Sequence, residues 1–314
     1  MMEEERQEKM ADDRPAVIIL NYNSFEDTVE LIESIEEYDP GHCIIVVDNA
    51  SDPEERQKLS AVEGRCITVL LEENGGYAAG NNAGIRKAAA LGYDTFLLAN
   101  SDTRLISRHA ISHCHAYMKS HGIGILGPGM VNGSGKDVAG TIRVDRYGRT
   151  KHHPATEATE CRSLTGAFLL IAGSVIREVG YLREFYFLYR EDTDYCLRAY
   201  DKGIKILYYP EVTVLHKEGT TTKNVADYYY HRNMFLLSRE IYGTGSTELA
   251  WFYLPGFIRC SLGIMKNETH RSRKALRLRQ LWRAYRDGVR DIRGKNLYLD
   301  HSTGLFYKDR NPEG

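Results

Sequence analysis

Polar side chains that could hold a metal ion stand at the ends of two predicted strands in this chain of 314 residues. Asp102 follows an apolar run at residues 95–99, which is typical of a buried strand, and Asn100 lies two positions before it. His216 closes a second predicted strand at residues 211–215. Oxygen ligands suit Mn²⁺ and Mg²⁺, which also bind phosphates, and neutral imidazole is a common metal ligand. We therefore expect Asp102, Asn100 and His216 to be metal ligands.

A second group of reactive side chains is the carboxylate cluster Glu191, Asp192 and Asp194. It follows the aromatic run Phe-Tyr-Phe-Leu-Tyr at residues 185–189. Negative side chains at a helix start are stabilised by the helix dipole, so a capped helix start is one interpretation. The aromatic run favours a binding site instead, because aromatic faces pack well against sugar rings. We expect the three carboxylates to lie in an active site.

Four segments rich in Asn, Asp and Gly directly follow predicted strands. The strands are expected at residues 16–20, 43–47, 67–71 and 95–99, and the polar segments at residues 21–23, 48–49, 74–76 and 100–102. Helical patterns between the strands, such as residues 80–90, favour an α/β sheet with mostly parallel strands. Ligands bind outside the carboxyl ends of such strands, so we expect the four segments to form one site. Each segment alone would also suit a turn.

The middle of the chain is rich in glycine. Residues 123–136 are expected to form loops, and further helices and strands are expected within residues 164–176, 191–201 and 204–215. A G-x-G-x-x-G match at residues 122–127 is not expected to bind a dinucleotide. Pro128 follows it, at the point where a helix would have to begin.

The net charge of −2 combines two oppositely charged parts. Residues 1–225 carry 25 basic and 34 acidic side chains, whereas residues 226–314 carry 16 basic and 9 acidic ones. We expect a flexible acidic leader at residues 1–14, an α/β domain at residues 15–225 and a basic helical region at residues 226–314. The charged start predicts no secretory signal, and no apolar run of 18 residues predicts a membrane span. Six scattered cysteines indicate reduced thiols and a cytoplasmic protein.

The basic region has two open interpretations. Residues 259–295 hold twelve Lys or Arg and three acidic residues, and apolar residues from Leu278 to Ile292 recur at helical spacing. Such a helix either packs on the α/β domain or makes peripheral contact with an anionic membrane through residues 251–295. We expect no nucleic acid as a partner, because the region lacks a recognisable binding motif. The oligomeric state stays open, with a homodimer as one alternative.

The order of these motifs resembles a known enzyme family. The motifs are Ile19-Leu-Asn-Tyr-Asn23, Val47-Asp-Asn-Ala-Ser51, Asn74-Gly-Gly-Tyr-Ala-Ala-Gly-Asn-Asn-Ala-Gly84, Asn100-Ser-Asp102, Thr165-Gly-Ala167, Glu191-Asp-Thr-Asp194 and His216. In this order they closely resemble the family 2 glycosyltransferases, above all their rhamnosyltransferase-like branch, over residues 15–240. The resemblance implies a GT-A fold, which is a Rossmann-like nucleotide-sugar-binding sheet of mixed but mostly parallel strands, here with a C-terminal helical extension.

The resemblance also implies roles for individual residues. Those expected to contact the nucleotide-sugar are Asn21, Tyr22, Asp48, Gly76, Asn81, Ser101 and Arg232. Among them, Tyr22 and Asp48 would meet the nucleotide base, and Arg232 would either reach the diphosphate or lie on a helix surface. Asp102 would bind the metal ion as the last residue of a D-x-D element. Asn100 replaces the first Asp of that element, which removes one charge and leaves the choice between Mn²⁺ and Mg²⁺ open.

The implied reaction is metal-dependent hexosyl transfer with inversion of configuration. Asp192 would be the catalytic base, with Glu191 and Asp194 shaping the acceptor site. The donor would be dTDP-rhamnose or a UDP-sugar. The acceptor would be a hydroxyl group of a glycan or lipid-linked saccharide in cell-surface polysaccharide synthesis, met in the cytoplasm or at the inner face of the membrane.

Two other functions compete with sugar transfer. A sugar-1-phosphate nucleotidylyltransferase would need a glycine-rich loop with a basic residue after the first strand, where this chain has Asn-Tyr-Asn at residues 21–23. A nucleic-acid-binding protein that uses the basic region would leave the carboxylate cluster without a role.

Overall fold

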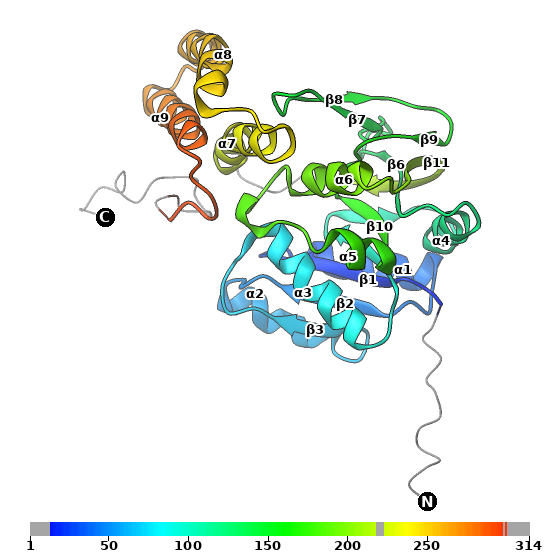
Figure 1. Ribbon diagram of the computed structural model, residues 1–314. Helices are drawn as coiled ribbons and strands as arrows, with labels where there is room; N and C mark the ends of the chain where they lie inside the picture. The colour runs from blue at the N-terminus through cyan, green and yellow to red at the C-terminus, as the bar shows by residue number, and fades with distance from the viewer. Residues whose placement is uncertain (1–12, 218–222, 298, 300–314) are drawn as a thin grey trace, which may run out of the picture.

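The computed structural model describes residues 13–217, 223–297 and 299, which build a mixed central sheet of nine strands (Figure 1). The strands run in the order β3-β2-β1-β4-β10-β6-β11-β5, and the short β9 pairs with β11. β7 and β8 form a separate hairpin. The strands are β1 (Ala16–Asn21), β2 (Ile44–Asp48), β3 (Ile67–Leu70), β4 (Thr95–Asn100), β5 (Thr103–Leu105), β6 (Ile125–Val131), β7 (Thr141–Val144), β8 (Thr150–His153), β9 (Thr159–Glu160), β10 (Phe168–Ala172) and β11 (Ile206–His216).

Helices pack along this sheet and extend beyond it at the C-terminal side (Figure 1). They are α1 (Phe25–Tyr38), α2 (Pro53–Lys58), α3 (Gly76–Ala90), α4 (Ala110–Ser120), α5 (Gly173–Val179), α6 (Glu191–Asp201), α7 (Lys223–Tyr242), α8 (Ser246–Asn267) and α9 (Arg271–Val289), with 3-10 turns η1 (Leu59–Val62) and η2 (Glu184–Tyr186). α3 packs on β1 and β2, α1 on β5, and α4 on β6 and β11. α6 contacts α5 on one side and α7 on the other.

The strands β1, β2 and β4 are apolar and mostly buried, whereas β3 at the edge of the sheet is partly exposed. Residues 16–19 of β1 have no exposed surface, and β1 pairs in parallel with both β2 and β4. Gly84 lets α3 approach this strand closely, since a Cβ there would lie 2.3 Å from the Cγ2 atom of Ile18. These strands confirm the predicted α/β class and its mostly parallel first half. The helix predicted from residue 80 begins earlier, at Gly76.

The glycine-rich stretch predicted to be loops contains a central strand instead. β6 lies between β10 and β11, antiparallel to the first and parallel to the second. Its Pro128 lies opposite Tyr209, where the register with β11 shifts, and such an irregularity tolerates the missing amide N–H of proline. A Cβ at Gly129 would lie 3.1 Å from Thr213 Oγ1, so glycine permits the close pairing. Glycine and proline predicted loops here, and pairing with distant strands overrode that local preference.

The three C-terminal helices share a core with one another and with the rest of the protein. Phe235 of α7 packs with Tyr253 and Phe257 of α8 and with Leu281 of α9. α7 also packs on η2, and its Ser238 Oγ donates a hydrogen bond of 2.6 Å to the carbonyl of residue 146 beside the β7–β8 hairpin.

One of the two predicted domain boundaries lies close to the start of a helix, and the other lies at the edge of the described residues. α7 begins at Lys223, close to the start of the basic region expected at residue 226. Of the leader predicted at residues 1–14, only residues 13 and 14 lie within the described chain. None of the helices in the described ranges combines the length and the apolar character needed to cross a bilayer.

Candidate active site

Asp102 and His216 meet at the edge of the sheet. The antiparallel pairing of β5 with β11 sets Thr103 opposite His216, and this brings His216 Nε2 to 3.4 Å from Asp102 Oδ1. The two side chains are 22% and 12% exposed, so a ligand can reach both. No group of three or more His, Cys, Asp or Glu side chains in the described ranges could hold a metal ion. An ion held by this pair would have to take further oxygen ligands from a bound phosphate or from Asn100, which is close in sequence at the end of β4.

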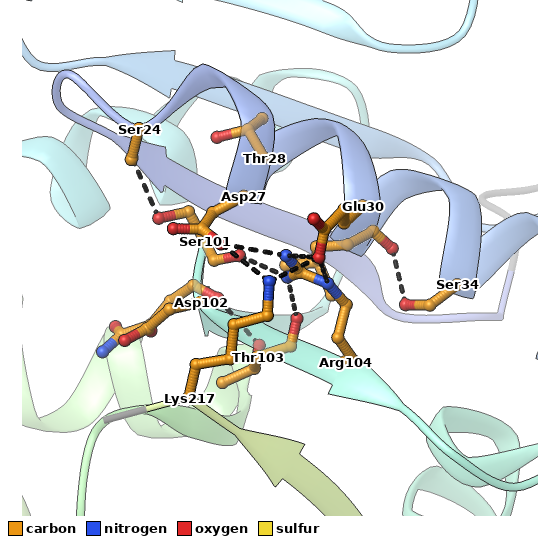
Figure 2. Close-up of polar contacts among 12 residues, drawn as sticks. Ser24, Asp27, Thr28, Glu30, Ser34, Ser101, Asp102, Thr103, Arg104 and Lys217 are labelled. Carbon is orange, nitrogen blue, oxygen red and sulfur yellow. Dashed lines mark hydrogen bonds and ion pairs between the residues drawn. The ribbon is translucent and has the colours of Figure 1, made fainter. Parts of the chain in front are cut away.

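A buried arginine, Arg104, orders the backbone on both sides of Asp102 (Figure 2). Its Nη1 donates a hydrogen bond of 2.6 Å to the carbonyl of Ser101 and another to the carbonyl of Thr103. Its Nε and Nη2 donate to Glu30 Oε2 at 3.0 Å and 2.7 Å. Sequence analysis did not identify Arg104, although it lies only two residues after Asp102 in the chain.

The same acidic side chains bind Lys217, the residue after His216. Lys217 Nζ donates to Asp27 Oδ1 at 3.1 Å and to Glu30, and Arg104 Nη2 donates to the same Asp27 oxygen at 3.2 Å (Figure 2). These bonds from two cations lower the pKa of Glu30 below its ordinary value. Both ends of the Asp102–His216 pair are thus fixed to α1 by one network of charges.

The polar residues after β1 and β2 bind mainly to one another. Asn21 and Asp48 are fully buried, and Asn21 Nδ2 donates to Asp48 Oδ1 at 2.9 Å. Asp48 Oδ2 accepts from the Ser51 amide at 3.2 Å and from Arg56 Nε at 2.8 Å. These two residues thus order the loops at the strand ends, and contact of Asp48 with a nucleotide base stays a prediction. Tyr22 is half-buried at the same edge.

The glycine-rich turn before α3 joins the second half of the protein. Gly76 has φ of +86°, and a Cβ there would clash with the Phe187 carbonyl, so only glycine suits this position. The Tyr77 amide donates a hydrogen bond of 2.8 Å to that same carbonyl. Asn49, which sequence analysis did not single out, donates to the Gly76 carbonyl at 3.1 Å and accepts from the Gly75 amide at 3.2 Å.

Asn81 and Ser101, which were also expected to contact the nucleotide-sugar, form different hydrogen bonds. Asn81 is fully buried and donates to the Tyr77 carbonyl at 3.0 Å, but its Oδ1 has no hydrogen-bond partner among the described residues. A buried acceptor without a partner is costly, and contact of Asn81 with a nucleotide-sugar stays a prediction. Ser101 Oγ lies 3.0 Å from Ser24 Oγ, within hydrogen-bonding distance.

Asp192 lies half-buried at the start of α6, next to the end of β4. Its Oδ2 accepts a hydrogen bond of 2.9 Å from the Gly166 amide. The neighbouring Ala167 carbonyl accepts from the Asn100 amide at 2.9 Å. Tyr77 Oη donates to the Gly166 carbonyl at 2.6 Å, and burial raises the pKa of this phenol, which therefore stays a hydrogen-bond donor. Residues 166 and 167 thus connect the carboxylate cluster to the candidate metal ligands.

The three clustered carboxylates have different environments. Glu191 is buried, and burial, followed by the charge of Asp192, raises its pKa to about 8. Glu191 is therefore protonated at neutral pH and adds no charge beside Asp192. Asp194 is fully buried and receives hydrogen bonds from Arg183 at 2.9 Å and Arg198 at 2.8 Å.

The position of Asp194 contradicts the acceptor-site role expected from sequence. Besides both arginines, Tyr186 donates to it at 3.2 Å, and its side chain has no exposed surface. A substrate cannot reach an oxygen enclosed in this way. Asp194 instead holds α6 against the segment that precedes it.

That segment contains three residues other than glycine with left-handed backbone conformations. Phe187, Tyr189 and Arg190 have φ of 66°, 67° and 80°, and each such residue costs about 1–3 kcal/mol unless its surroundings impose it. Asn233 Nδ2 lies 3.0 Å, 2.8 Å and 2.7 Å from the carbonyl oxygens of Tyr186, Leu188 and Tyr189. These hydrogen bonds impose the strained conformation of the segment, and Asp192 follows directly after it.

Arg232 assists Asn233 and does not occupy either position expected from sequence. It is fully buried, and its guanidinium donates hydrogen bonds of 2.7 Å to the Tyr186 carbonyl and of 2.6 Å to the Gly294 carbonyl. Its side chain therefore does not lie on a helix surface, and a diphosphate bound from solvent cannot reach it. Its spacing within a tyrosine-rich helix gave no sign of these distant carbonyl partners.

The raised pKa of Glu191 predicts a pH dependence of stability. The folded chain keeps the Glu191 proton up to about pH 8, whereas the unfolded chain releases it near the ordinary value of 4.5. Stability from this group is complete below the unfolded pKa and is lost as pH rises through the folded one, by roughly 5 kcal/mol in total. Glu191→Gln should remove that loss in urea unfolding without ligands. Equal pH slopes for both proteins would contradict the prediction, and Asp201→Asn on the same helix is the control.

Replacing Asn233 should release the segment before α6. In Asn233→Ala, the three carbonyls lose the two N–H donors that they share, so we expect the free energy of unfolding to fall by about 2–4 kcal/mol. Amide hydrogen exchange in residues 186–190 should accelerate more than exchange in β1. The matched control is Asn267→Ala at the exposed end of α8. Unaltered exchange in residues 186–190 would show that Asn233 does not hold this segment.

Two relatives match most of this chain. A protein described as a low-salt glycan biosynthesis hexosyltransferase, Agl10 of Haloferax volcanii, is 29% identical over 263 residues, which cover 75% of this chain and 78% of that protein. A dTDP-rhamnosyl transferase, RfbF of Shigella flexneri, is 26% identical over 239 residues, which cover 71% of this chain and 79% of that protein.

The fold and the sequence family agree. The structure of the mannosyltransferase PcManGT from Pyrobaculum calidifontis, in complex with GDP-Man and Mn²⁺, is similar to this chain with a TM-score of 0.55. That match has 11% sequence identity and covers 89% of this chain and 88% of the other, so it shows the shared GT-A fold. Residues 14–233 match the family model described as "Glycosyltransferase like family 2". Because that match spans well over half of the chain, the protein belongs to glycosyltransferase family 2.

Proposed function

We propose that this glycosyltransferase moves a sugar from a nucleotide-sugar to an acceptor hydroxyl group with inversion of configuration, and that Asp192 is its catalytic base. The observation that carries the proposal is the position of Asp192. Its carboxylate accepts from Gly166, and the adjacent Ala167 pairs with Asn100 at the strand end that leads to Asp102. Residues 166–167 therefore link Asp192 by hydrogen bonds to the strand end that leads to the proposed metal ligands, which supports the proposal.

The chemistry follows from this arrangement. The acceptor oxygen forms a bond to the anomeric carbon while the bond from that carbon to the diphosphate breaks on the opposite face, which inverts the configuration. The proton of the acceptor hydroxyl group passes to Asp192. The neutral Glu191 beside it avoids a second negative charge there. The nucleoside diphosphate leaves.

Asp102, His216 and Asn100 are the residues proposed to hold a divalent metal ion. A carboxylate, an imidazole and an amide oxygen suit Mn²⁺ or Mg²⁺, and such an ion neutralises negative charge on a departing diphosphate. The match to a fold neighbour described with Mn²⁺ supports this assignment. Asn100 in place of a carboxylate lowers the charge of the site and should weaken metal binding relative to a site with two carboxylates.

The relatives support a choice of substrates. One is described as a dTDP-rhamnosyl transferase and the other as a hexosyltransferase of glycan biosynthesis. We propose dTDP-rhamnose as the first donor to test, a UDP-sugar as the second, and a glycan or lipid-linked saccharide as the acceptor. The cytoplasm and the inner face of a membrane are the proposed site of action. The family match disfavours both a nucleotidylyltransferase and a nucleic-acid-binding protein.

Removing the proposed base should abolish transfer and spare donor binding. We expect Asp192→Asn to lower the rate of sugar transfer by about 10²–10⁴-fold, because general base catalysis contributes that much. Donor affinity, measured by calorimetry, should change little, since Asp192 is placed on the acceptor side. Asp201→Asn, an exposed carboxylate at the other end of α6, is the matched control. Near-normal transfer by Asp192→Asn would reject the assignment.

Removing a proposed metal ligand should uncouple nucleotide binding from the ion. In the wild type we expect UDP or dTDP to raise the melting temperature more with Mn²⁺ than without it. Asp102→Ala and His216→Ala should each abolish this additional rise, whereas Asp201→Ala should retain it. If Mn²⁺ has the same effect on the variants as on the wild type, neither side chain holds the ion.

A further inference from the structure

The helix α8 is apolar on two opposite faces. One face packs inside the C-terminal region, where Leu249, Tyr253 and Phe257 are buried with residues of α7 and α9. A helix that is apolar all round is normally enclosed by protein or lipid. α8 packs mainly on α9 and lies at the edge of the molecule, away from the central sheet (Figure 1). Its second apolar face therefore has no cover within the described residues.

This second face, here called the α8 stripe, consists of Trp251, Ile258, Leu262 and Met265. Their side chains are 72%, 45%, 60% and 55% exposed, values that are unusual for large apolar residues. Their spacings of seven, four and three residues place them in one line along a helix. Pro255 is exposed on the same side and carries no charge.

Positive charge borders the α8 stripe. Arg259 and Lys266 are exposed and follow Ile258 and Met265 directly, which places them along one edge of the line. The segment from residue 249 to residue 267 contains no acidic residue. The following helix α9 begins with Arg271 and Arg273, which are also exposed. Apolar side chains with a basic border match the chemistry of an anionic lipid surface.

A second copy of the chain is a less suitable cover for this face. A symmetric dimer formed through the α8 stripe would bring the same surface of both copies together. Arg259 lies near the middle of the stripe, so antiparallel pairing would bring it close to Arg259 of the other copy, and like charges repel. An anionic lipid surface instead attracts Arg259 and Lys266 and also accepts tryptophan at the level of its headgroups.

We propose that the α8 stripe, with Arg259 and Lys266, docks this enzyme on the surface of an anionic membrane. α8 lies in the plane of the interface, with its outer apolar side chains among the headgroups and upper acyl chains. The membrane proposal depends on the proposed function in one respect only: the membrane would bring a lipid-linked acceptor to Asp192. Membrane binding itself requires neither donor nor metal ion.

The test is flotation of the full chain with lipid vesicles at low salt, without nucleotide-sugar. We expect it to float with vesicles of equal parts phosphatidylcholine and phosphatidylglycerol and to remain unbound with phosphatidylcholine alone. The double variant Trp251→Ser, Leu262→Ser should lower the bound fraction about tenfold or more, as should Arg259→Glu with Lys266→Glu. Leu70→Ser, at a position 51% exposed on β3, is the matched control and should float like the wild type.

The outcomes separate this proposal from its alternatives. Absence of flotation with the anionic vesicles overturns it, as does equal flotation of the wild type and the Trp251→Ser, Leu262→Ser variant. The proposal is also overturned, in favour of a second copy on this face, if light scattering shows that the wild type is a dimer and that this variant is a monomer. Hydrolysis of the nucleotide-sugar, measured on the same preparations, tests the proposed function separately. Hydrolysis without flotation rejects only the membrane surface, and flotation without hydrolysis rejects only the proposed reaction.

Discussion

The hydrogen bonds from Asn233 and Arg232 to the backbone carbonyls of residues 186–189 are the constraint on which the carboxylate cluster depends. They impose a left-handed backbone on three residues that are not glycine, and α6 begins directly after them. Gly76 and Tyr77 then fit against the Phe187 carbonyl, which ties the turn after β3 to the same segment. α7 thus supports the segment before the proposed base from outside the α/β sheet, because it supplies the hydrogen-bond donors that fix this segment.

Burial decides what each acidic side chain near this segment can do. Asp194 loses contact with water and is compensated by two arginines, so its charge holds structure in place. Glu191 is buried with one carboxyl oxygen lacking a hydrogen-bond partner among the described residues, and it responds by keeping its proton. Asp192, between them in sequence, remains partly accessible. Three neighbouring carboxylates thereby acquire three roles, and only their different environments distinguish them.

Sequence patterns predicted the strands and turns whose structure depends on residues close to one another in the chain. The apolar runs at residues 16–20 and 95–99 are strands because they are buried from both sides, and the polar segments follow them as expected. The patterns failed where distant contacts decide. β6 is a central strand despite Pro128, because β10 and β11 pair with it. Arg232 carries a charge that suggested a phosphate, yet carbonyls more than 40 residues away in sequence occupy it. Arg104 was missed although it lies two residues after Asp102, because its acidic partners on α1 are more than 70 residues away in sequence.

α7 connects the two surfaces that a lipid-linked acceptor would have to meet. Asn233 holds the segment before Asp192, and two residues later Phe235 packs against Tyr253 of α8 with ring centres 4.5 Å apart. Arg239 of α7 donates to the carbonyl of Gly288 in α9 at 3.0 Å, which fixes the third helix to the same support. Because one helix carries both sets of contacts, the α8 stripe and the proposed base cannot shift independently of each other without breaking buried packing. A membrane bound at the α8 stripe would therefore have a fixed orientation relative to Asp192, and that orientation would limit which hydroxyl group of a lipid-linked saccharide reaches the base.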